Sequence, residues 1–274
     1  MTPATDSLPD LGGEVTLAPE QIAAWQRDGH TLVRGVADDG EVAAYRPIIV
    51  EETLRQSAER RPLAERDTYH RAFIQVTNLW RKSEAVKRFV LARRFAKIAA
   101  DLMGVDAVRI YHDQALLKEG GGGHTPWHQD QFYWPLDTDN TITMWMPLVD
   151  CPVEMGALTF ASSRDALGYR SEMPISDDSH REIASFIAKN HLPIVVGDLR
   201  AGDATFHSGW CLHSAPPNRS DRMREVMTVI YYEDGARLKS PESEHERVDR
   251  EAWYPGSEPG DLAASELTPV VFHR

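Results

Sequence analysis

The stretch "AVRIYHDQALLK", residues 107–118, marks the point where the character of the chain changes. Its side chains alternate, so Val108, Ile110, His112, Gln114 and Leu116 would share one face of an extended backbone. This period of two residues is typical of a strand with two different faces. We therefore expect a β-sheet to begin here.

Further strand-like segments follow, and all of them are short. They are "TITMWMPLVD" (141–150), "GALTFAS" (156–162), "LPIVVG" (192–197), "ATFHSGWCLH" (204–213) and "REVMTVIYYE" (224–233). Proline and glycine separate them, and one helix-like segment over 175–191 interrupts the series. Short strands at this spacing are typical of an antiparallel sandwich or barrel, here of jelly-roll type.

The residues before this region are predicted to be mainly helical, in an α+β arrangement. Helical spacing occurs over 18–28, 40–61 and 83–103, the last in two pieces, with a strand over 30–36. We expect a disordered tail over 1–15 and then a single domain over 16–274. Its parts are a helical portion to about 104, a β core over about 105–235 and a C-terminal loop or lid segment over about 236–274.

The composition excludes several classes of partner. The formal net charge of −12 repels phosphate backbones and anionic membrane surfaces, so neither nucleic acid nor a membrane is expected as a partner. The two cysteines, Cys151 and Cys211, are expected to be free thiols. The first fifteen residues lack the basic start and apolar run of a signal peptide, so we expect a cytoplasmic protein. The sequence does not indicate an oligomeric state.

Metal-binding chemistry is suggested by "TPWHQDQFYWP", residues 125–135. If this segment is a strand, His128 and Asp130 point to the same face and offer an imidazole and a carboxylate side by side. Two such ligands and a second histidine make the facial site of iron oxygenases, which leaves three positions open. His207 and His213 are the candidates for the third ligand. We prefer His213 and interpret His207 as structural.

These residues carry a resemblance to a known family. "WHQD" together with "LHSAPPNRSDRMR" resembles the phytanoyl-CoA dioxygenase family over roughly residues 20–235. The resemblance implies a cupin-like double-stranded β-helix and an oxygenase that uses iron(II), 2-oxoglutarate and O2. It implies that His128, Asp130 and His213 bind the metal. Arg224, eleven residues after His213, would pair with the distal carboxylate of 2-oxoglutarate, and Arg222 is the second candidate for this role.

The resemblance also suggests other contacts to 2-oxoglutarate. Trp145, Thr143 and Gln114 lie near the positions that hold the cosubstrate in the family, although His112 shares the face of Gln114 and competes for its role. Ala215 stands where the family often has serine, so one hydrogen bond to the cosubstrate is missing or replaced.

The implied reaction is hydrogen abstraction from a C–H bond of a small organic molecule. Hydroxylation is the default outcome, and epimerisation, desaturation or oxidative cyclisation in bacterial natural-product biosynthesis remain open. Halogenation is not expected, because related halogenases lack the carboxylate ligand. The substrate pocket is expected at the mouth of the barrel, beside a mobile "KEGGGG" loop. Its candidate residues are Phe132, Tyr133, Trp134, His124 and Trp210.

Two other classes of function are compatible with parts of this pattern. The first is a metal-dependent cupin-like hydrolase or isomerase that does not use 2-oxoglutarate. It has no need of an arginine at position 224. The second is a non-catalytic binding module, which has no use for three metal ligands.

Overall fold

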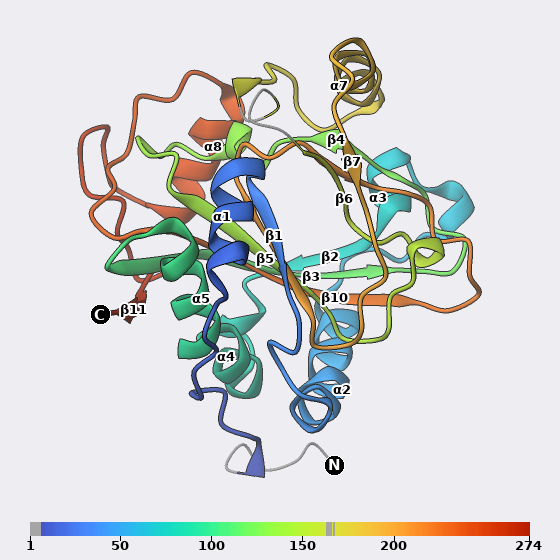
Figure 1. Cartoon of the computed structure of the whole chain (residues 1–274), viewed down its shortest axis with the longest axis horizontal. Helices are drawn as coiled ribbons and strands as arrows, with labels where there is room; N and C mark the ends of the chain where they lie inside the picture. Colours follow the sequence, from blue (N-terminus) through green and yellow to red (C-terminus); the bar gives the residue numbers. More distant parts are fainter. Residues whose placement is uncertain (1–6, 163–165, 167) are drawn as a thin grey trace.

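The protein consists of two antiparallel β-sheets with helices packed around them (Figure 1). The computed structural model describes residues 7–162, 166 and 168–274. In this part of the chain the larger sheet has seven strands: β1 (His30–Val33), β8 (Ala204–Ser208), β5 (Thr141–Pro147), β10 (Arg224–Glu233), β3 (Ala107–Lys118) and β11 (Val270–His273) in this order, with β2 (Ile74–Thr77) also paired to β3. The smaller sheet has the order β4 (Thr125–His128), β9 (His213–Ala215), β6 (Thr159–Ala161) and β7 (Ile194–Val195).

The helices lie mostly before β3. They are α1 (Pro19–Asp28), α2 (Asp39–Gln56), α3 (Thr68–Ala72), α4 (Glu84–Val90), α5 (Arg93–Met103), α7 (Asp177–Lys189) and α8 (Glu244–Trp253), with short 3₁₀ turns η2 (Leu63–Glu65), η3 (Leu79–Arg81), η4 (Asp130–Tyr133) and η5 (Val153–Met155). In Figure 1, α2 and α4 lie below the strands of the larger sheet and α5 lies at their left, whereas α7 and α8 lie in the upper part of the view. None of the described helices is both long and apolar enough to span a membrane.

The two faces of the larger sheet pack against different partners. Alternate residues of β5 and β10, including Met144, Met146 and Val229, belong to the core formed with α2, α4 and α5. Their neighbours Thr143, Trp145 and Thr228 line a cavity on the opposite face. The period-2 pattern that predicts a shared face for Thr143 and Trp145 therefore decides which side chains reach the cavity.

Several predicted elements are confirmed at their expected places. Helix α1 begins at Pro19 and ends at Gly29, which has φ 74°. The segment over 83–103 is indeed two helices, α4 and α5, and Gly104 with φ 73° ends the second. Ser176 caps α7 by accepting a hydrogen bond from the N–H of Ser179. Helix α2 stops at Gln56, earlier than predicted, and Pro47 lies inside it.

Strand β3 has the predicted bounds but not a single apolar face. Its register with β10 shifts, because Tyr231 pairs with Ile110 whereas Ile230 pairs with His112, and Tyr111 is left as a bulge. The bulge exchanges the faces of the strand. Ile110 packs in the helix-side core, whereas His112 and the alternate residues after it line the cavity.

Two other predictions were wrong. The expected strand over 204–213 is divided into β8 and β9, which belong to different sheets. The break falls at Gly209, where a Cβ atom would lie 2.4 Å from Gln131 Oε1. The C-terminal segment, expected to be loop, contains helix α8 and strand β11. Residues 1–6 of the predicted tail lie outside the described residues, and Leu8 and Leu11 are buried in the core.

The glycine segment over 120–123 is held by many contacts. The N–H of Gly123 donates to the carbonyl of Arg71 at 2.7 Å, and the N–H of Gly121 donates to the carbonyl of Asn218 at 2.9 Å. A Cβ atom on Gly120 would lie 2.9 Å from the backbone of Asp221. The glycines therefore permit close backbone packing, which the prediction of a mobile loop did not anticipate.

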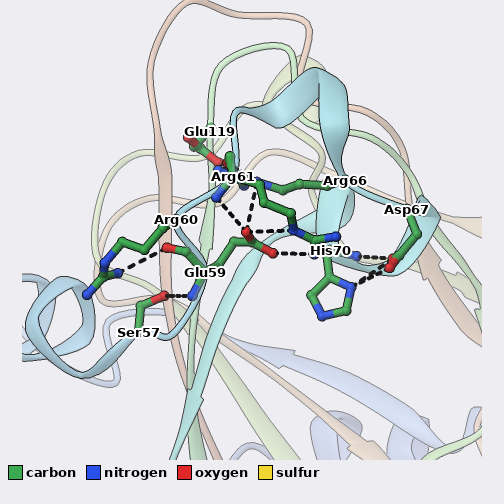
Figure 2. Close-up of polar contacts among 8 residues, drawn as sticks. All are labelled: Ser57, Glu59, Arg60, Arg61, Arg66, Asp67, His70 and Glu119. Atoms are coloured by element: carbon green, nitrogen blue, oxygen red, sulfur yellow. Dashed lines mark hydrogen bonds and ion pairs between the residues drawn. The ribbon is translucent and has the colours of Figure 1, made fainter.

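An ion-pair cluster secures the start of this segment. Figure 2 shows Arg66 between Glu119, which precedes the glycines, and Glu59, which follows α2. The side chain of Arg66 is only 6% exposed, so the pair with Glu119 is better shielded from water than a surface pair. The cluster joins the segment after α2 to the loop that leads into β4.

Candidate active site

A cavity of about 490 Å³ lies between the two sheets. Its floor is the face of the larger sheet that carries Thr143, Trp145 and Thr228. The smaller sheet contributes His128 and His213. Residues from α3, β2 and α8 complete the walls, so the cavity is enclosed by elements from every third of the chain.

His128, Asp130 and His213 come together at one side of this cavity. The Nε2 atoms of His128 and His213 each lie 3.5 Å from Asp130 Oδ1. The three side chains form a group able to hold a metal ion. His128 and His213 are direct partners in the β4–β9 pair, so the smaller sheet fixes their spacing.

Asp130 reaches this group in a different way from the one predicted. Strand β4 ends at His128, and Asp130 begins the 3₁₀ turn η4. The two side chains therefore do not share a strand face. The turn brings Asp130 beneath both histidines instead, and its Oδ2 accepts a hydrogen bond from Thr143 Oγ1 at 3.0 Å.

The chemistry of these donors fits a divalent metal. The Nδ1 atom of His128 is 2.8 Å from the carbonyl of Pro126, and that of His213 is 2.9 Å from the carbonyl of Cys211. A carbonyl can only accept, so both imidazoles carry their proton on Nδ1 when neutral and present a bare Nε2. Burial, and then the neighbouring His128, lower the pKa of His213 well below its ordinary value.

Asp130 supplies the negative charge of the group. Burial alone would raise the pKa of Asp130, but His213 and contacts with His128 and His207 hold it well below its ordinary value. The Nε2 lone pairs of the two imidazoles and the Asp130 carboxylate oxygen thus face one another, and none of these three atoms carries a proton. A divalent cation would satisfy all three.

Arg224 is a buried cation on the floor of the same cavity. It is 1% exposed, and its pKa is lowered to about 10 by burial. Its Nη1 donates to the carbonyl of Gly156 at 2.6 Å, whereas Nε has no hydrogen-bond partner among the described residues. Within the described part of the chain no carboxylate forms an ion pair with it. An unpaired buried guanidinium fits the carboxylate of an acidic ligand.

The residues predicted to contact the cosubstrate all line the cavity. Trp145 lies beside Arg224, with the guanidinium carbon 5.3 Å from its ring centroid. Thr143 donates its hydroxyl to Asp130, as described above. Gln114 and its competitor His112 both face the cavity from β3.

The predicted substrate-pocket residues are divided between different surroundings. Tyr133 and Trp134 line the cavity, whereas the other three are not among its lining residues. Phe132 packs against Tyr133 and His245. Trp210 donates its indole N–H to Asp139 at 2.7 Å, and His124 lines a separate depression with His180.

Other cavity residues were not predicted from the sequence. Helix α8 contributes His245, Asp249 and Trp253, and the α3–β2 region contributes Tyr69 and Gln75. The sequence predicted only a loop or lid segment over about 236–274, without naming residues that reach the cavity. His207 was interpreted as structural, yet its Nε2 lies 3.4 Å from Asp130 Oδ2. Its strand pairing with Thr143 places it there, and only the fold reveals that pairing.

Comparison with known proteins agrees with this geometry. The family model described as phytanoyl-CoA dioxygenase (PhyH) matches residues 25–226. The chain is similar to the crystal structure of the non-haem α-ketoglutarate-dependent carbocyclase SnoK from nogalamycin biosynthesis. The TM-score is 0.76 at 25% identity, and the match covers 94% of this chain and 99% of that one.

Two further structures extend the comparison. The epimerase SnoN, in complex with Fe³⁺, α-ketoglutarate and nogalamycin RO, matches with a TM-score of 0.74 at 25% identity over 92% of this chain and 97% of that one. EvdO2 from Micromonospora carbonacea var. aurantiaca, at 18% identity and a TM-score of 0.63 over 85% and 98% of the two chains, shows the fold alone.

The curated proteins contain no sequence that matches this chain significantly. The family model nevertheless covers most of its length, including both segments that carry the predicted metal ligands. The chain therefore belongs to the phytanoyl-CoA dioxygenase family of iron- and 2-oxoglutarate-dependent oxygenases, as its sequence resemblance predicted.

Proposed function

We propose that this protein is an iron(II)- and 2-oxoglutarate-dependent oxygenase that removes a hydrogen atom from a C–H bond of a small, ring-containing natural product. His128, Asp130 and His213 would hold the iron, and Arg224 would bind 2-oxoglutarate. The observation that carries this proposal is the presence of two complementary sites in one cavity. Two histidines and an aspartate form a group able to hold a metal ion, and a buried arginine with no ion-pair partner among the described residues lies on the floor of the same cavity.

The protein residues orient the reactants and limit the access of water. The guanidinium of Arg224 can donate two parallel N–H hydrogen bonds to a carboxylate, which sets the direction of the cosubstrate. Trp145 lies against that guanidinium and limits its movement. When bound, iron(II) supplies the oxidising chemistry with 2-oxoglutarate and O2, for which no side chain of the chain is suited.

The cavity is consistent with a substrate of one or a few rings. Its volume of about 490 Å³ lies in the range of small-molecule pockets, and its walls include aromatic rings from Tyr133, Trp134 and Trp253. Hydroxylation is the default outcome. The relatives SnoK, a carbocyclase, and SnoN, an epimerase, favour the alternatives of ring closure or epimerisation over the desaturation that we also considered.

A finer description of the architecture belongs to the same proposal. The two sheets would be the halves of a cupin-like jelly-roll, and residues 16–274 would act as one domain with α8 as part of its lid. A small organic molecule would be its partner. The cytoplasmic location stays a prediction from the sequence.

The test is 2-oxoglutarate binding and turnover by protein loaded with iron(II) without oxygen. We expect a visible charge-transfer band on addition of 2-oxoglutarate, and slow release of succinate once air is admitted. Asp130→Ala and His213→Ala should lose both signals. Arg224→Ala should keep iron but need far more 2-oxoglutarate. The exposed Arg222→Ala is the matched control and should behave like the wild type. Absence of both the band and succinate from the wild type would refute the proposal and favour the hydrolase.

A further inference from the structure

The two oxygen atoms of Asp130 face different groups. Oδ1 lies 3.5 Å from the Nε2 atoms of both His128 and His213, within the proposed metal site. Oδ2 points toward the larger sheet. There it accepts the hydroxyl of Thr143 at 3.0 Å and lies 3.4 Å from Nε2 of His207. One oxygen is thus offered to a metal and the other is held by the protein.

His207 is placed for this contact by its strand. It lies on β8 directly opposite Thr143 on β5, so two adjacent strands present a hydroxyl and an imidazole to the same oxygen. The imidazole is 1% exposed and is packed between the rings of Phe160 and His213, with centroids 5.5 Å and 4.4 Å away. The ring therefore has little room to turn away from Asp130.

No other group in the described structure satisfies the ring nitrogens of His207, since neither Nδ1 nor Nε2 has a hydrogen-bond partner. Leaving a buried polar group unpaired is unfavourable. A shift of a few tenths of an ångström would turn the 3.4 Å contact into a hydrogen bond from Nε2–H to Asp130 Oδ2.

The number of carboxylate oxygens through which Asp130 binds the metal matters for the chemistry. A carboxylate that binds a metal through both oxygens takes a coordination position that a cosubstrate needs. Hydrogen bonds to the second oxygen oppose that mode, and groups of this kind commonly orient metal ligands in proteins. Thr143 alone provides one such bond, and His207 would provide the second.

We propose that His207 is a positioning residue that donates Nε2–H to Asp130 Oδ2 and, with Thr143, restricts Asp130 to binding the metal through Oδ1. This inference rests on the proposed function, because it requires a metal at His128, Asp130 and His213. It assigns His207 a place outside the ligand set, although its ring neighbours that of His213.

Titration of metal-free protein with cobalt(II), followed by visible absorption, tests the assignment without catalysis. His207→Phe keeps a ring of similar shape but lacks the donor, and His207→Gln restores an N–H donor. Thr205→Val is the matched control, because Thr205 is a buried residue two positions earlier on β8. Circular dichroism checks that each variant folds, and His207→Met replaces His207→Phe if that ring is not accommodated.

We expect His207→Phe to raise the cobalt(II) Kd by about 10- to 100-fold and to change the absorption spectrum. His207→Gln should recover most of the affinity, and Thr205→Val should stay within about twofold of the wild type. Wild-type affinity and spectrum in His207→Phe would overturn the assignment. The assignment would also be overturned if both His207→Phe and His207→Gln lost as much cobalt(II) affinity as Asp130→Ala, because His207 would then be a metal ligand. If the wild type bound no cobalt(II), the metal site of the proposed function would itself be wrong.

Discussion

Two buried basic residues lie opposite each other on β10 and β3, where Arg224 pairs with Lys118. Lys118 donates to the carbonyls of Gly123 and Pro216 at 2.6 and 3.1 Å. Burial, and then Arg224, lower the pKa of Lys118 to about 6. At neutral pH the lysine can therefore be uncharged. Arg224 keeps its positive charge, which attracts an anionic cosubstrate.

Replacing Arg224 by lysine should separate charge from geometry. Arg224→Lys keeps a cation but loses the planar pair of donors that matches a carboxylate. We expect the KM for 2-oxoglutarate to rise on the order of 10- to 100-fold while kcat falls much less, because the loss is mainly in binding. Steady-state succinate release measures both constants.

Arg222→Lys is the control for that experiment. Arg222 is exposed and precedes β10, so its substitution should leave both constants unchanged. An unchanged KM for 2-oxoglutarate in Arg224→Lys would mean that this arginine does not hold the cosubstrate.

Among the structural elements, the glycine segment before β4 depends on close packing. Gly120→Ala should destabilise the protein by about 1–3 kcal/mol, because its Cβ would lie 2.9 Å from the backbone of Asp221, which cannot move independently. Chemical denaturation measures the change. Gly197→Ala is the control, since its Cβ meets nothing within 4 Å and should change the free energy of unfolding by less than about 0.5 kcal/mol. Equal stabilities would show that the loop yields at low cost.

A partly buried hydrogen bond near the cavity connects helix α8 to the larger sheet. Tyr111, the bulged residue of β3, donates its hydroxyl to Asp249 Oδ2 at 2.7 Å. Tyr111→Phe should increase amide hydrogen exchange throughout 244–253 and lower stability by about 1–2 kcal/mol, because the buried carboxyl loses its donor. Glu251→Gln alters only the exposed face of α8 and should not affect exchange near Asp249. Unchanged exchange in Tyr111→Phe would assign the docking of α8 to its apolar contacts.

The elements also show what local sequence can predict. Alternation gave the bounds of β3 correctly, and capping residues gave the ends of α1 and α5. The bulge at Tyr111 was not predictable, because it depends on pairing with β10. The division of 204–213 at Gly209 depends on crowding by Gln131, which is distant in sequence. Helix α8 was missed, and a loop or lid was predicted instead, because Glu244–Trp253 contains few apolar side chains that could show a helical period.

In the candidate site too, local sequence predicted some residues, whereas others depend on the pairing of distant segments. Ligand types and spacing suggested His128, Asp130, His213 and Arg224, and the fold brings these four residues to one cavity. His207 could not be assigned from the sequence, since its contact with Asp130 depends on the β5–β8 register. Phe132, Trp210 and His124 were expected in the substrate pocket but are not among the residues that line the cavity.

At the scale of the whole molecule, one buried carboxyl connects the sheet to the helical layer. The bulge in β3 turns Asp113 away from the cavity, and its carboxyl accepts the backbone N–H groups of Leu79 and Trp80 at 3.0 and 3.3 Å. These groups begin the turn η3, which leads into α4. Asp113 therefore caps this turn from a strand of the sheet.

This cap should make the stability of the protein depend on pH. Burial raises the pKa of Asp113 to about 7 in the folded state, above the value of 3.8 that describes the exposed group. The folded state thus favours the protonated carboxyl. The contribution of Asp113 to the free energy of unfolding is complete below about pH 4 and is lost as the pH rises through 7.

Asp113→Asn tests this dependence, because the amide cannot ionise. The variant loses one of the two hydrogen bonds, which lowers stability by a constant amount at every pH. Apart from that constant loss, the free energy of unfolding of the variant should rise relative to that of the wild type by up to roughly 4 kcal/mol between pH 4 and 8. Urea denaturation at each pH measures this difference. Asp106→Asn, at a side chain that is 90% exposed, should follow the wild-type profile. Parallel profiles for Asp113→Asn and the wild type would mean that the two backbone donors keep Asp113 ionised in the fold, and that the junction of sheet and helices holds a permanent buried charge.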